Sequence, residues 1–453
     1  MFQRIREQFT DQFHRTLAGR PGGSRRIGAE LKFPLVRPDG TAVGRDTVDA
    51  LWQYLAGCGW KPTVDAVTGR VVGCSKPGEQ NDHVAGCETG YCKTEFSLAH
   101  VADLNALENL LRLLRVELAP FAETNQVRFL AHGIHPVTSP GKRLLLKKVR
   151  TSVWDKAAPS NRCIAKEDGD DVHLFTVNAG SHVHLSVGAE EAIRAVNVLC
   201  GFAGPQIALA AHSNVWRGQL DRQYKAVSEK LWDWWEPARD RSGVPPEPFA
   251  SLDHYAECVG RMRPIYAKRD GMPVVLTKYE TFAEYYASAT AEGSDLDGHP
   301  VQLTPAPEDL DLHNSCYWYT ARISRYFTVE NRVFDQQPPD AILAPAALSL
   351  GLVSALDEAE EELRQYGWDA LRAARESACR YALQGQVKGH SLADAARGML
   401  SVARQGLERR NLGEERFLEP FEARLQTRRS PADETAELFA AGGVEAIIEA
   451  RSI

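Results

Sequence analysis

The chain has 453 residues, and 53 Lys and Arg against 60 Asp and Glu give a formal net charge of −7. Hydrophobic residues make up 43% of the sequence and charged residues 25%, which is typical of a globular protein and excludes collagen-like and wholly disordered classes. The acidic balance and the lack of a long basic tract argue against a nucleic-acid binder, which needs a positive surface.

The N-terminal segment MFQRIREQFTDQF is charged and has no apolar stretch, so we expect no secretory signal. No run of 18 apolar residues occurs, so we expect no transmembrane helix and no membrane partner. The nine cysteines are scattered and include no CxxC pair, which favours free thiols over a zinc knuckle of Cys74, Cys87 and Cys92. Free thiols indicate a reducing compartment, so the predicted location is the cytoplasm.

The first predicted elements are strands and helices in turn. Residues 27–36, IGAELKFPLV, alternate between two kinds of side chain and predict a strand with one buried face. Residues 46–56 predict a helix that ends before Gly57. Residues 93–98 predict a second strand. The helix expected after it has leucines at helical spacing: Leu104, Leu107, Leu111, Leu114 and Leu118.

The middle of the chain continues this mixture. Residues 127–135 and 172–187 predict strands, a helix is expected at about 190–211, and the aromatic and β-branched stretch 316–335 favours strands. The Pro- and Gly-rich stretches 236–248 and 291–311 predict long loops that could cover a site.

From about residue 346 the pattern is helical, with helix starts at Ser391 and at Ser430-Pro431. No internal repeat and no biased linker divides the chain, so we expect one domain over residues 1–453. Its sheet-rich core is predicted at about 25–345 and its helical part at about 346–453. Strands that come first and helices that come late predict an α+β fold with an antiparallel sheet.

Four of the predicted strands share an unusual feature. If these segments are strands, period-two geometry places their polar side chains on one face, opposite an apolar face. The polar sets are Glu30 and Lys32; Lys93, Glu95 and Ser97; His182, His184 and Ser186; and Glu330 and Arg332. For any one strand a solvated face explains the pattern. Paired histidines and Glu beside Arg, repeated on several strands, are unusual for a plain surface.

Such side chains on one concave face would repel one another unless cations or an anionic ligand balanced them. Magnesium commonly takes a few carboxylates together with substrate phosphates, whereas zinc favours more His and Cys. Glu30, Glu95 and Glu330 with one imidazole therefore fit a magnesium–nucleotide site better than a zinc site.

Five segments, in order, resemble the glutamate–cysteine ligase group 2 family, and within it the shorter bacterial carboxylate–amine ligases. They are IGAELKFPLV, KTEFSLA, FLAHGIHPV, the segment from NAGSHVHLSV through ALAAHS, and RISRYFTVENRVFDQQP. CRYALQG near residue 380 resembles a late helix of the same family. The resemblance spans about residues 27–385. Each motif alone is weak, and their order and spacing together are fairly specific.

This resemblance implies a single ligase domain with a fold similar to the catalytic domain of glutamine synthetase. In that fold a curved antiparallel sheet forms a funnel and is backed by helices. The resemblance also implies a reaction. ATP activates the γ-carboxylate of glutamate as an acyl phosphate, with release of ADP, and an amine then attacks to form a γ-glutamyl amide. The implied cofactors are ATP and Mg²⁺.

The resemblance further implies roles for individual residues. The implied magnesium ligands are Glu30, Glu95, His182 and Glu330. Arg332 would contact the transferring phosphate, for which a guanidinium is a permanent and bidentate cation. His184 would sit beside that phosphate, and Arg322 would bind the nucleotide or a substrate carboxylate.

The sequence departs from the family at Lys32, where members usually have a second acid on the face of the first Glu. A protonated lysine cannot ligate magnesium. Either its ammonium replaces part of the charge of a lost metal ion, or the strand register differs, or this member is catalytically altered. Lys32 is a catalytic candidate, with a phosphate or the acyl substrate as its predicted contact.

Other features have plainer explanations. The basic cluster KRLLLKKVR at 142–150 could reach nucleotide phosphates but is more typical of a solvated face. The aromatic segment LWDWWEP at 231–237 is typical of a packed patch, although it could shape an acceptor pocket. His135 precedes a proline and is interpreted as structural, and Asp335 is expected to cap a turn.

Two other functions remain open. One is a metal-dependent amide hydrolase built on the HxH and Glu motifs, and the other is a non-catalytic relative, suggested by Lys32, that binds a nucleotide or metabolite. For the leading function the expected partners are small molecules, namely glutamate and an amine or amino acid, and no nucleic acid. The charged C-terminal helices offer a surface for a homo-oligomer.

Overall fold

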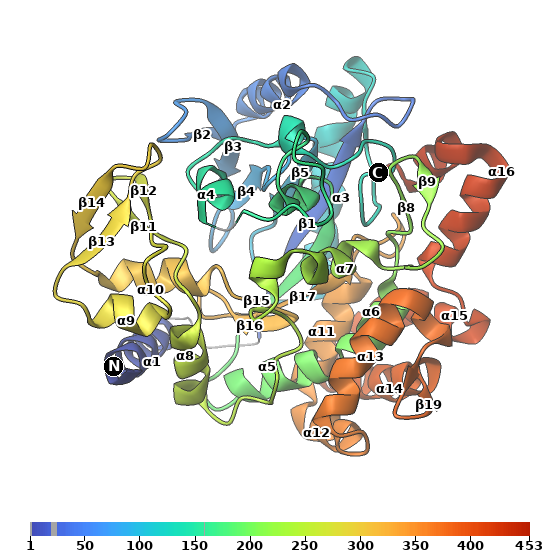
Figure 1. Ribbon diagram of the computed structural model, residues 1–453. Helices are drawn as coiled ribbons and strands as arrows, with labels where there is room; N and C mark the ends of the chain where they lie inside the picture. Colours follow the sequence, from blue (N-terminus) through green and yellow to red (C-terminus); the bar gives the residue numbers. More distant parts are fainter. Residues whose placement is uncertain (1, 20–24, 158) are drawn as a thin grey trace.

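The strands that carry the polar sets lie side by side in one antiparallel sheet (Figure 1). The computed structural model describes residues 2–19, 25–157 and 159–453. Within that part of the chain, the strands in order across the sheet are β16 (Ala321–Ile323), β17 (Val329–Asp335), β7 (Gly180–Leu185), β1 (Ile27–Val36), β5 (Lys93–Ser97), β4 (His83–Gly86), β3 (Val71–Lys76) and β2 (Lys61–Val64), with β6 (Arg128–Phe129) paired to β1. The predictions of strands at 27–36, 93–98 and within 316–335 are confirmed.

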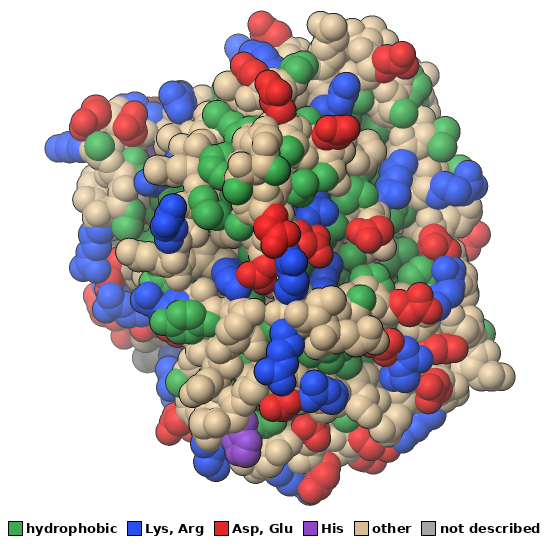
Figure 2. All heavy atoms as spheres, turned by 90° about the vertical axis from the view of Figure 1, so that its right-hand side faces the viewer, with side chains coloured by type: hydrophobic (Ala, Val, Ile, Leu, Met, Phe, Trp, Pro, Cys, Tyr) green, Lys and Arg blue, Asp and Glu red, His purple; other side chains and the backbone are tan. Residues whose placement is uncertain are grey.

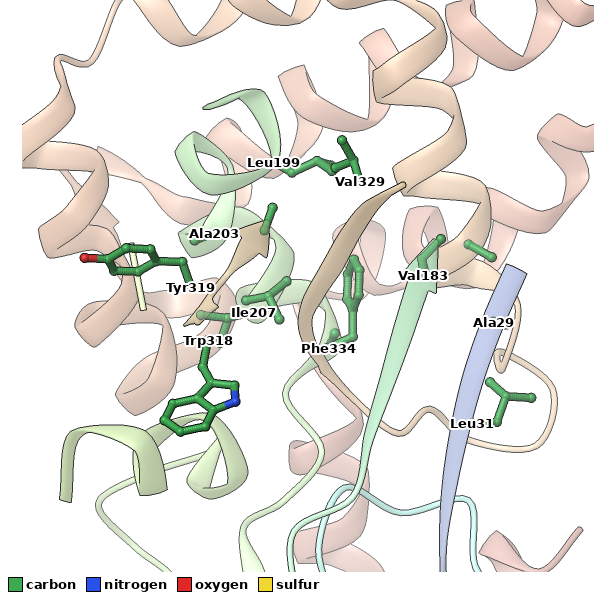
Figure 3. Packing of buried hydrophobic residues seen from close by; sticks show 14 of the residues in the cluster. Ala29, Leu31, Val183, Leu199, Ala203, Ile207, Trp318, Tyr319, Val329 and Phe334 are labelled. Atoms are coloured by element: carbon green, nitrogen blue, oxygen red, sulfur yellow. The ribbon is translucent and has the colours of Figure 1, made fainter. Parts of the chain in front are cut away.

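Helices cover the apolar face of this sheet. They are α2 (Arg45–Gly57), α3 (Leu104–Thr124), α5 (Ala192–Gly201), α6 (Ala203–Ala210) and α11 (Ala344–Ser354). Ala29, Leu31 and Val183 are buried on this side, and Figure 3 shows Leu199 of α5 beside Val329 of β17. Because the helices occupy one face, the alternating polar side chains are left on the other. The prediction of an α+β fold with an antiparallel sheet backed by helices is confirmed.

The helix expected at about 190–211 is broken into α5 and α6 at Phe202, with a bend of 57°. Pro205 lies in the first turn of α6, where it cannot donate to the carbonyl of Gly201 and its ring crowds that carbonyl. Among the described residues no single helix is long and apolar enough to cross a bilayer; only the bent α5–α6 pair passes on length and composition, and most of its residues are buried.

The stretch 291–311, expected as a loop, is structured. Two hairpins form a small antiparallel sheet of β11 (Tyr266–Arg269), β12 (Met272–Val275), β13 (Ala291–Ser294) and β14 (Pro300–Leu303). The turn between β13 and β14 uses Gly298 at φ +90°, and Asp295 accepts hydrogen bonds from the backbone of Asp297 and His299. Turn residues inside a hairpin explain why the composition resembled a loop. The helices packed near this sheet are α1 (Phe2–Ala18), α8 (Leu252–Arg261), α9 (Phe282–Ala287) and α10 (Pro307–Asn314).

Two strand predictions were too long. Residues 171–176 form a 3₁₀ helix instead of the first half of a strand. The backbone N–H of Asp170 donates to Nδ1 of His173, the backbone N–H of His173 donates to the carbonyl of Asp170, and the hydroxyl of Thr176 donates to the carbonyl of His173. At 127–135 only β6 is a strand. Beyond it the backbone changes partners: Ala131 donates to Arg451, and Gly133 donates to His212.

The C-terminal region is helical, as predicted. Its helices are α12 (Leu356–Arg364), α13 (Trp368–Tyr381), α14 (Leu392–Arg410), α15 (Glu419–Thr427) and α16 (Pro431–Arg451). Both predicted helix starts are confirmed: Ser391 accepts a hydrogen bond from the backbone of Ala393, and Ser430 caps α16 with Pro431 next to it. Figure 2 shows the face formed by this end of the molecule, where acidic and basic side chains are interspersed.

The remaining elements are short. They are α4 (Trp154–Ala157), α7 (Val227–Trp234), the pair β8 (Val215–Trp216) and β9 (Gln219–Leu220), the parallel pair β10 (Ser242–Gly243) and β15 (Trp318–Tyr319), and the hairpin β18 (Gln386–Val387) and β19 (His390–Ser391). All nine cysteines are free thiols, as expected. One hydrophobic cluster extends from Ile5 in α1 to Ala432 in α16.

Candidate active site

Strand register brings the predicted polar residues together. In the β1–β7 pair Glu30 lies opposite His182, and in the β1–β5 pair Lys32 lies opposite Glu95. On the other side of β7, Glu330 of β17 lies opposite His184. Because each side chain projects from the same face as its cross-strand partner, four strands contribute to one cluster.

This cluster lines one large cavity of about 1500 Å³. Every residue predicted for the site from the sequence lines it: Glu30, Lys32, Glu95, His182, His184, Arg322, Glu330 and Arg332. Lys32 and Glu30 thus face the same cavity, as the alternation in β1 predicts.

One part of the cluster has the geometry of a cation site. The ligand atoms of Glu30, His184 and Glu330 all lie within 4.8 Å of one another. Glu30 Oε1 is 3.0 Å from Nε2 of His184, whose Nδ1 lies 2.9 Å from the hydroxyl of Thr328. Two carboxylates and one imidazole make a donor set rich in oxygen, which suits a hard divalent cation such as Mg²⁺.

The other predicted metal ligands lie around Lys32. The Lys32 Nζ is 3.1 Å from Oε2 of Glu95, 3.1 Å from Nδ1 of His182 and 3.6 Å from Oε2 of Glu30. The structure groups His184 with the two acids of the candidate cation site. Nδ1 of His182 also lies 3.0 Å from Oε2 of Glu30 and 3.5 Å from Oε1 of Glu330. The roles of His182 and Glu95 as ligands stay predictions.

Two arginines hold Glu330. Nε of Arg322 donates to Oε2 of Glu330 at 2.7 Å, and Arg332 pairs with the other carboxylate oxygen. Arg322 also donates to the backbone carbonyls of Ser315 and Tyr317, at 2.9 and 2.7 Å, so its position is fixed from several sides. Arg332 has fewer protein partners, and its Nη1 is 3.5 Å from Nδ1 of His182. Of the two guanidinium groups, Arg332 is thus the one better able to reach a ligand.

The cluster shifts the acid–base behaviour of its members. Burial raises the pKa of Glu95 to about 6, and burial together with Lys32 lowers the pKa of His182 to about 4. Burial acts against ionisation of Glu30 as well, but hydrogen bonds from His182 and His184 hold the pKa of Glu30 well below its usual range. For Lys32 the carboxylates of Glu88, Glu95 and Glu30 outweigh burial and raise its pKa. At neutral pH Glu30 is therefore a carboxylate and Lys32 an ammonium.

The structure adds residues to the site that the sequence did not assign. Glu88, in the loop before β5, lies 3.8 Å from Nζ of Lys93, and Lys93 donates to Oδ1 of Asn178 at 2.6 Å. Glu88 and Asn178 line the cavity, and Lys93, which contacts both, is buried. Lys93 was visible as a member of the polar face of its strand, but the loop residue Glu88 had no periodic signal.

Two segments singled out in the sequence also reach the cavity. From the basic cluster 142–150, Lys148 and Arg150 line it, while Lys142 and Lys147 line a separate shallow pocket. From the aromatic segment, Trp232 and Trp235 line the cavity and contact the ring of Trp318 at 5.4 and 5.5 Å.

His135 and Asp335, which are expected to have structural roles, both accept hydrogen bonds from the backbone. Nδ1 of His135 accepts from the backbone of Val137 and Thr138 in the turn after it. Asp335 ends β17 and accepts from the backbone of His212 and the hydroxyl of Ser213, each at 2.7 Å. Both fit the structural interpretation.

The fold and the site define the class: an α+β protein whose antiparallel sheet carries carboxylates, imidazoles and guanidinium groups in one cavity. A sequence model described as glutamate–cysteine ligase family 2 matches residues 27–450. The chain therefore belongs to the glutamate–cysteine ligase family 2.

Curated relatives agree with this membership. Two curated relatives carry the name "Putative glutamate–cysteine ligase 2-3". The one from Rubrobacter xylanophilus is 30% identical over 162 residues, 36% of this chain and 40% of the relative. The one from Mycolicibacterium smegmatis is 26% identical over 300 residues, 61% of this chain and 75% of the relative. The first match thus spans two fifths of that relative's length.

Among solved structures, glutamate–cysteine ligase from Francisella tularensis in complex with AMP has a similar fold. The TM-score is 0.53 at 12% identity, and the superposition covers 94% of this chain and 87% of that one. At this identity the comparison establishes the fold.

Proposed function

We propose that this protein is an ATP-dependent carboxylate–amine ligase. It activates the γ-carboxylate of glutamate as an acyl phosphate and joins it to the amine of an amino acid or another small amine. The balanced reaction converts ATP, glutamate and the amine into ADP, inorganic phosphate and a γ-glutamyl amide. Membership of the glutamate–cysteine ligase family 2 supports the class of reaction.

One observation carries this proposal. Glu30, His184 and Glu330 form a candidate cation site in the same cavity as Arg322 and Arg332. Phosphoryl transfer asks a protein mainly for positioning and charge neutralisation, and a divalent cation beside guanidinium groups supplies both. An amide hydrolase needs no cluster of buried arginines, so this arrangement favours the ligase.

The residues of the cavity would have different roles in this reaction. Glu30, His184 and Glu330 would hold Mg²⁺, which when bound neutralises phosphate charge and polarises the phosphoryl group. Arg332 is oriented by Glu330 and would donate to a phosphate oxygen through its planar guanidinium. Arg322 keeps Glu330 in place through its own hydrogen bond. The AMP complex of the Francisella tularensis enzyme supports a nucleotide as a ligand of this cavity.

The acceptor amine would enter beside the aromatic wall. Trp154, Trp232, Trp235 and Trp318 line the same cavity as Glu330. Arg150 links the two regions, because its guanidinium lies 5.9 Å from the ring of Trp154 and donates to the carbonyl of Ser315, which also accepts from Arg322. The Ser315 carbonyl thus connects Arg150 at the aromatic wall with Arg322, which holds Glu330.

The test is an incubation of the purified chain with ATP, Mg²⁺, glutamate and a panel of amino acids and small amines, read by product mass. The expected product has the mass of glutamate plus amine minus water, and ADP forms only when both substrates are present. Amide cleavage without nucleotide would show a hydrolase instead. Nucleotide binding with no turnover across the panel would contradict the ligase and favour a non-catalytic relative.

A further inference from the structure

Lys32 is a charged side chain in a place where charge is costly. It is 1% exposed and lies in the middle of β1, at the floor of the cavity. An ammonium out of water is tolerated only when it is closely paired and hydrogen-bonded. Its partners are the carboxylates of Glu30 and Glu95 and the imidazole of His182, all within 3.6 Å.

These partners are the donor types that bind divalent cations. Two carboxylate oxygens and one imidazole nitrogen surround Nζ of Lys32, as they would surround a metal ion. The neighbouring set, Glu30, His184 and Glu330, has the same donor types. Lys32 reaches this set through the other oxygen of Glu30, and the cations that contact Glu330 are guanidinium groups. Glu30 belongs to both sets: its Oε1 faces His184 and its Oε2 faces Lys32 and His182.

A divalent cation cannot share the first set with Lys32. Such an ion must lie about 2.0–2.6 Å from its oxygen ligands, which would place it in contact with the ammonium. Other cations nearby, Lys93 and Arg332, add to this repulsion. The second set uses Oε1 of Glu30, the oxygen that faces His184, and its ligand atoms lie within 4.8 Å of one another. Its Glu330 is paired with the guanidinium groups of Arg322 and Arg332.

We propose that the Lys32 ammonium is a built-in cation that occupies the place of a divalent ion among Glu30, Glu95 and His182. Each chain then holds a single divalent cation without nucleotide, at Glu30, His184 and Glu330. Lys32 is a positioning residue, because it fixes Oε2 of Glu30 and leaves Oε1 for the cation. This inference rests on the cation site of the proposed function.

The test counts bound Mn²⁺, which replaces Mg²⁺ and can be followed by electron paramagnetic resonance of the free ion. The full chain is titrated with Mn²⁺ in the absence of nucleotide. A second, exposed group of Asp295, Asp297 and His299 could also take Mn²⁺. All titrations therefore use an Asp295→Asn background, so that only the cavity is counted.

The expected result is one Mn²⁺ per chain with Lys32 present and two per chain after Lys32→Glu. Lys32→Met is the second variant, because it removes the ammonium without adding an acid; it should gain a second, weaker ion. Retention of native circular dichroism identifies the variants that are folded, and the count for the unsubstituted Lys32 does not depend on either of them.

Two Mn²⁺ of similar affinity with Lys32 present would overturn the inference, as would no bound Mn²⁺. A folded Lys32→Glu or Lys32→Met chain that still binds one ion would also overturn it. The ligase assignment is judged separately by product mass. If the chain binds two Mn²⁺ ions and forms the amide, only this inference is refuted. If it binds one Mn²⁺ ion and forms no amide, only the ligase assignment is refuted.

Discussion

Arg322 and Arg332 both line the cavity, but their hydrogen-bond partners give them different roles. Arg322 is bound to three backbone carbonyls and to Glu330, so it acts as scaffold for that acid. Arg332 shares Glu330 but has few other protein contacts. The arginine of β16 therefore holds Glu330 in position, whereas the arginine of β17 is available to contact a ligand.

We predict that Arg332→Ala lowers kcat by about 10²–10³-fold, the usual cost of losing one donor to a developing anion. The fold should survive, because Glu330 keeps its hydrogen bond from Arg322. Steady-state kinetics and thermal unfolding measure the two effects. Arg397→Ala is the matched control, since Arg397 is exposed on α14 and pairs with Asp394 on the same helix. A fully active Arg332→Ala chain would refute the role.

We predict that Glu30→Gln weakens binding of Mn²⁺ by about 100-fold or more, because even the outer partners of metal ligands contribute 10- to 100-fold. The amide keeps the shape of the side chain and removes its charge, so the change reports ligation. Calorimetric titration measures the affinity. Glu292→Gln, at a partly exposed acid of β13, serves as control. Unchanged affinity in Glu30→Gln would remove Glu30 from the cation site.

Among the secondary-structure elements, the α11–α14 pair supports the sheet from behind. The two helices approach closely at Gly351 and Gly406. A Cβ on Gly351 would overlap the backbone of Ala403, and a Cβ on Gly406 would overlap the carbonyl of Gly351. Since α11 also packs on β7 and β1, this contact sets how close the helices lie to the strands of the site.

We predict that Gly351→Ala lowers the free energy of unfolding by about 1–3 kcal/mol, the usual cost of forcing extra volume into a packed interface. Denaturant unfolding measures it. Gly57→Ala is the control, because Gly57 is exposed at the end of α2 and no atom lies within 4 Å of an added Cβ. Equal stability of the two variants would show that the helices can move apart without cost.

Prediction of the elements from sequence succeeded where one local signal dominated. The alternation in β1 and the leucine spacing in α3 each specify one period, and both elements are confirmed. Residues 172–176 are expected in a strand because apolar composition does not distinguish a strand from a short 3₁₀ helix, and the hydrogen bonds between Asp170 and His173 decide for the helix. The prediction of a long loop at 291–311 was wrong for a similar reason, because the tight turn of a hairpin has the composition of a loop.

For the molecule as a whole, buried histidines couple stability to pH. Burial lowers the pKa of His132, His135 and His313 to about 3. In the unfolded chain these imidazoles take up protons near pH 6.5, whereas in the folded chain they stay neutral. Their contribution is therefore complete above about pH 6.5 and is lost as the pH falls from there towards 3. Asp335 has the opposite effect on stability. Burial raises its pKa to about 8, so its contribution to the free energy of unfolding decreases as the pH rises.

We predict that the free energy of unfolding declines from pH 6.5 to pH 5. His313→Gln should make this decline shallower by up to about 1.4 kcal/mol per pH unit, the value for one titrating group. The glutamine amide can still donate to the carbonyl of Val259, which His313 contacts now. His14→Gln, at an exposed position, is the control. Identical slopes for His313→Gln and the unchanged chain would exclude His313 as a source.

Local sequence patterns were enough to predict which side chains share a face of each strand. Period-two alternation forced Glu30 with Lys32, His182 with His184 and Glu330 with Arg332 onto single faces of strands, and that property is local to each strand. Which of these side chains meet depends on how the strands pair. Cross-strand register placed His184 with Glu30 and Glu330, and put Lys32 among Glu30, Glu95 and His182. Register and loop paths depend on contacts between residues far apart in the chain, which no local pattern encodes.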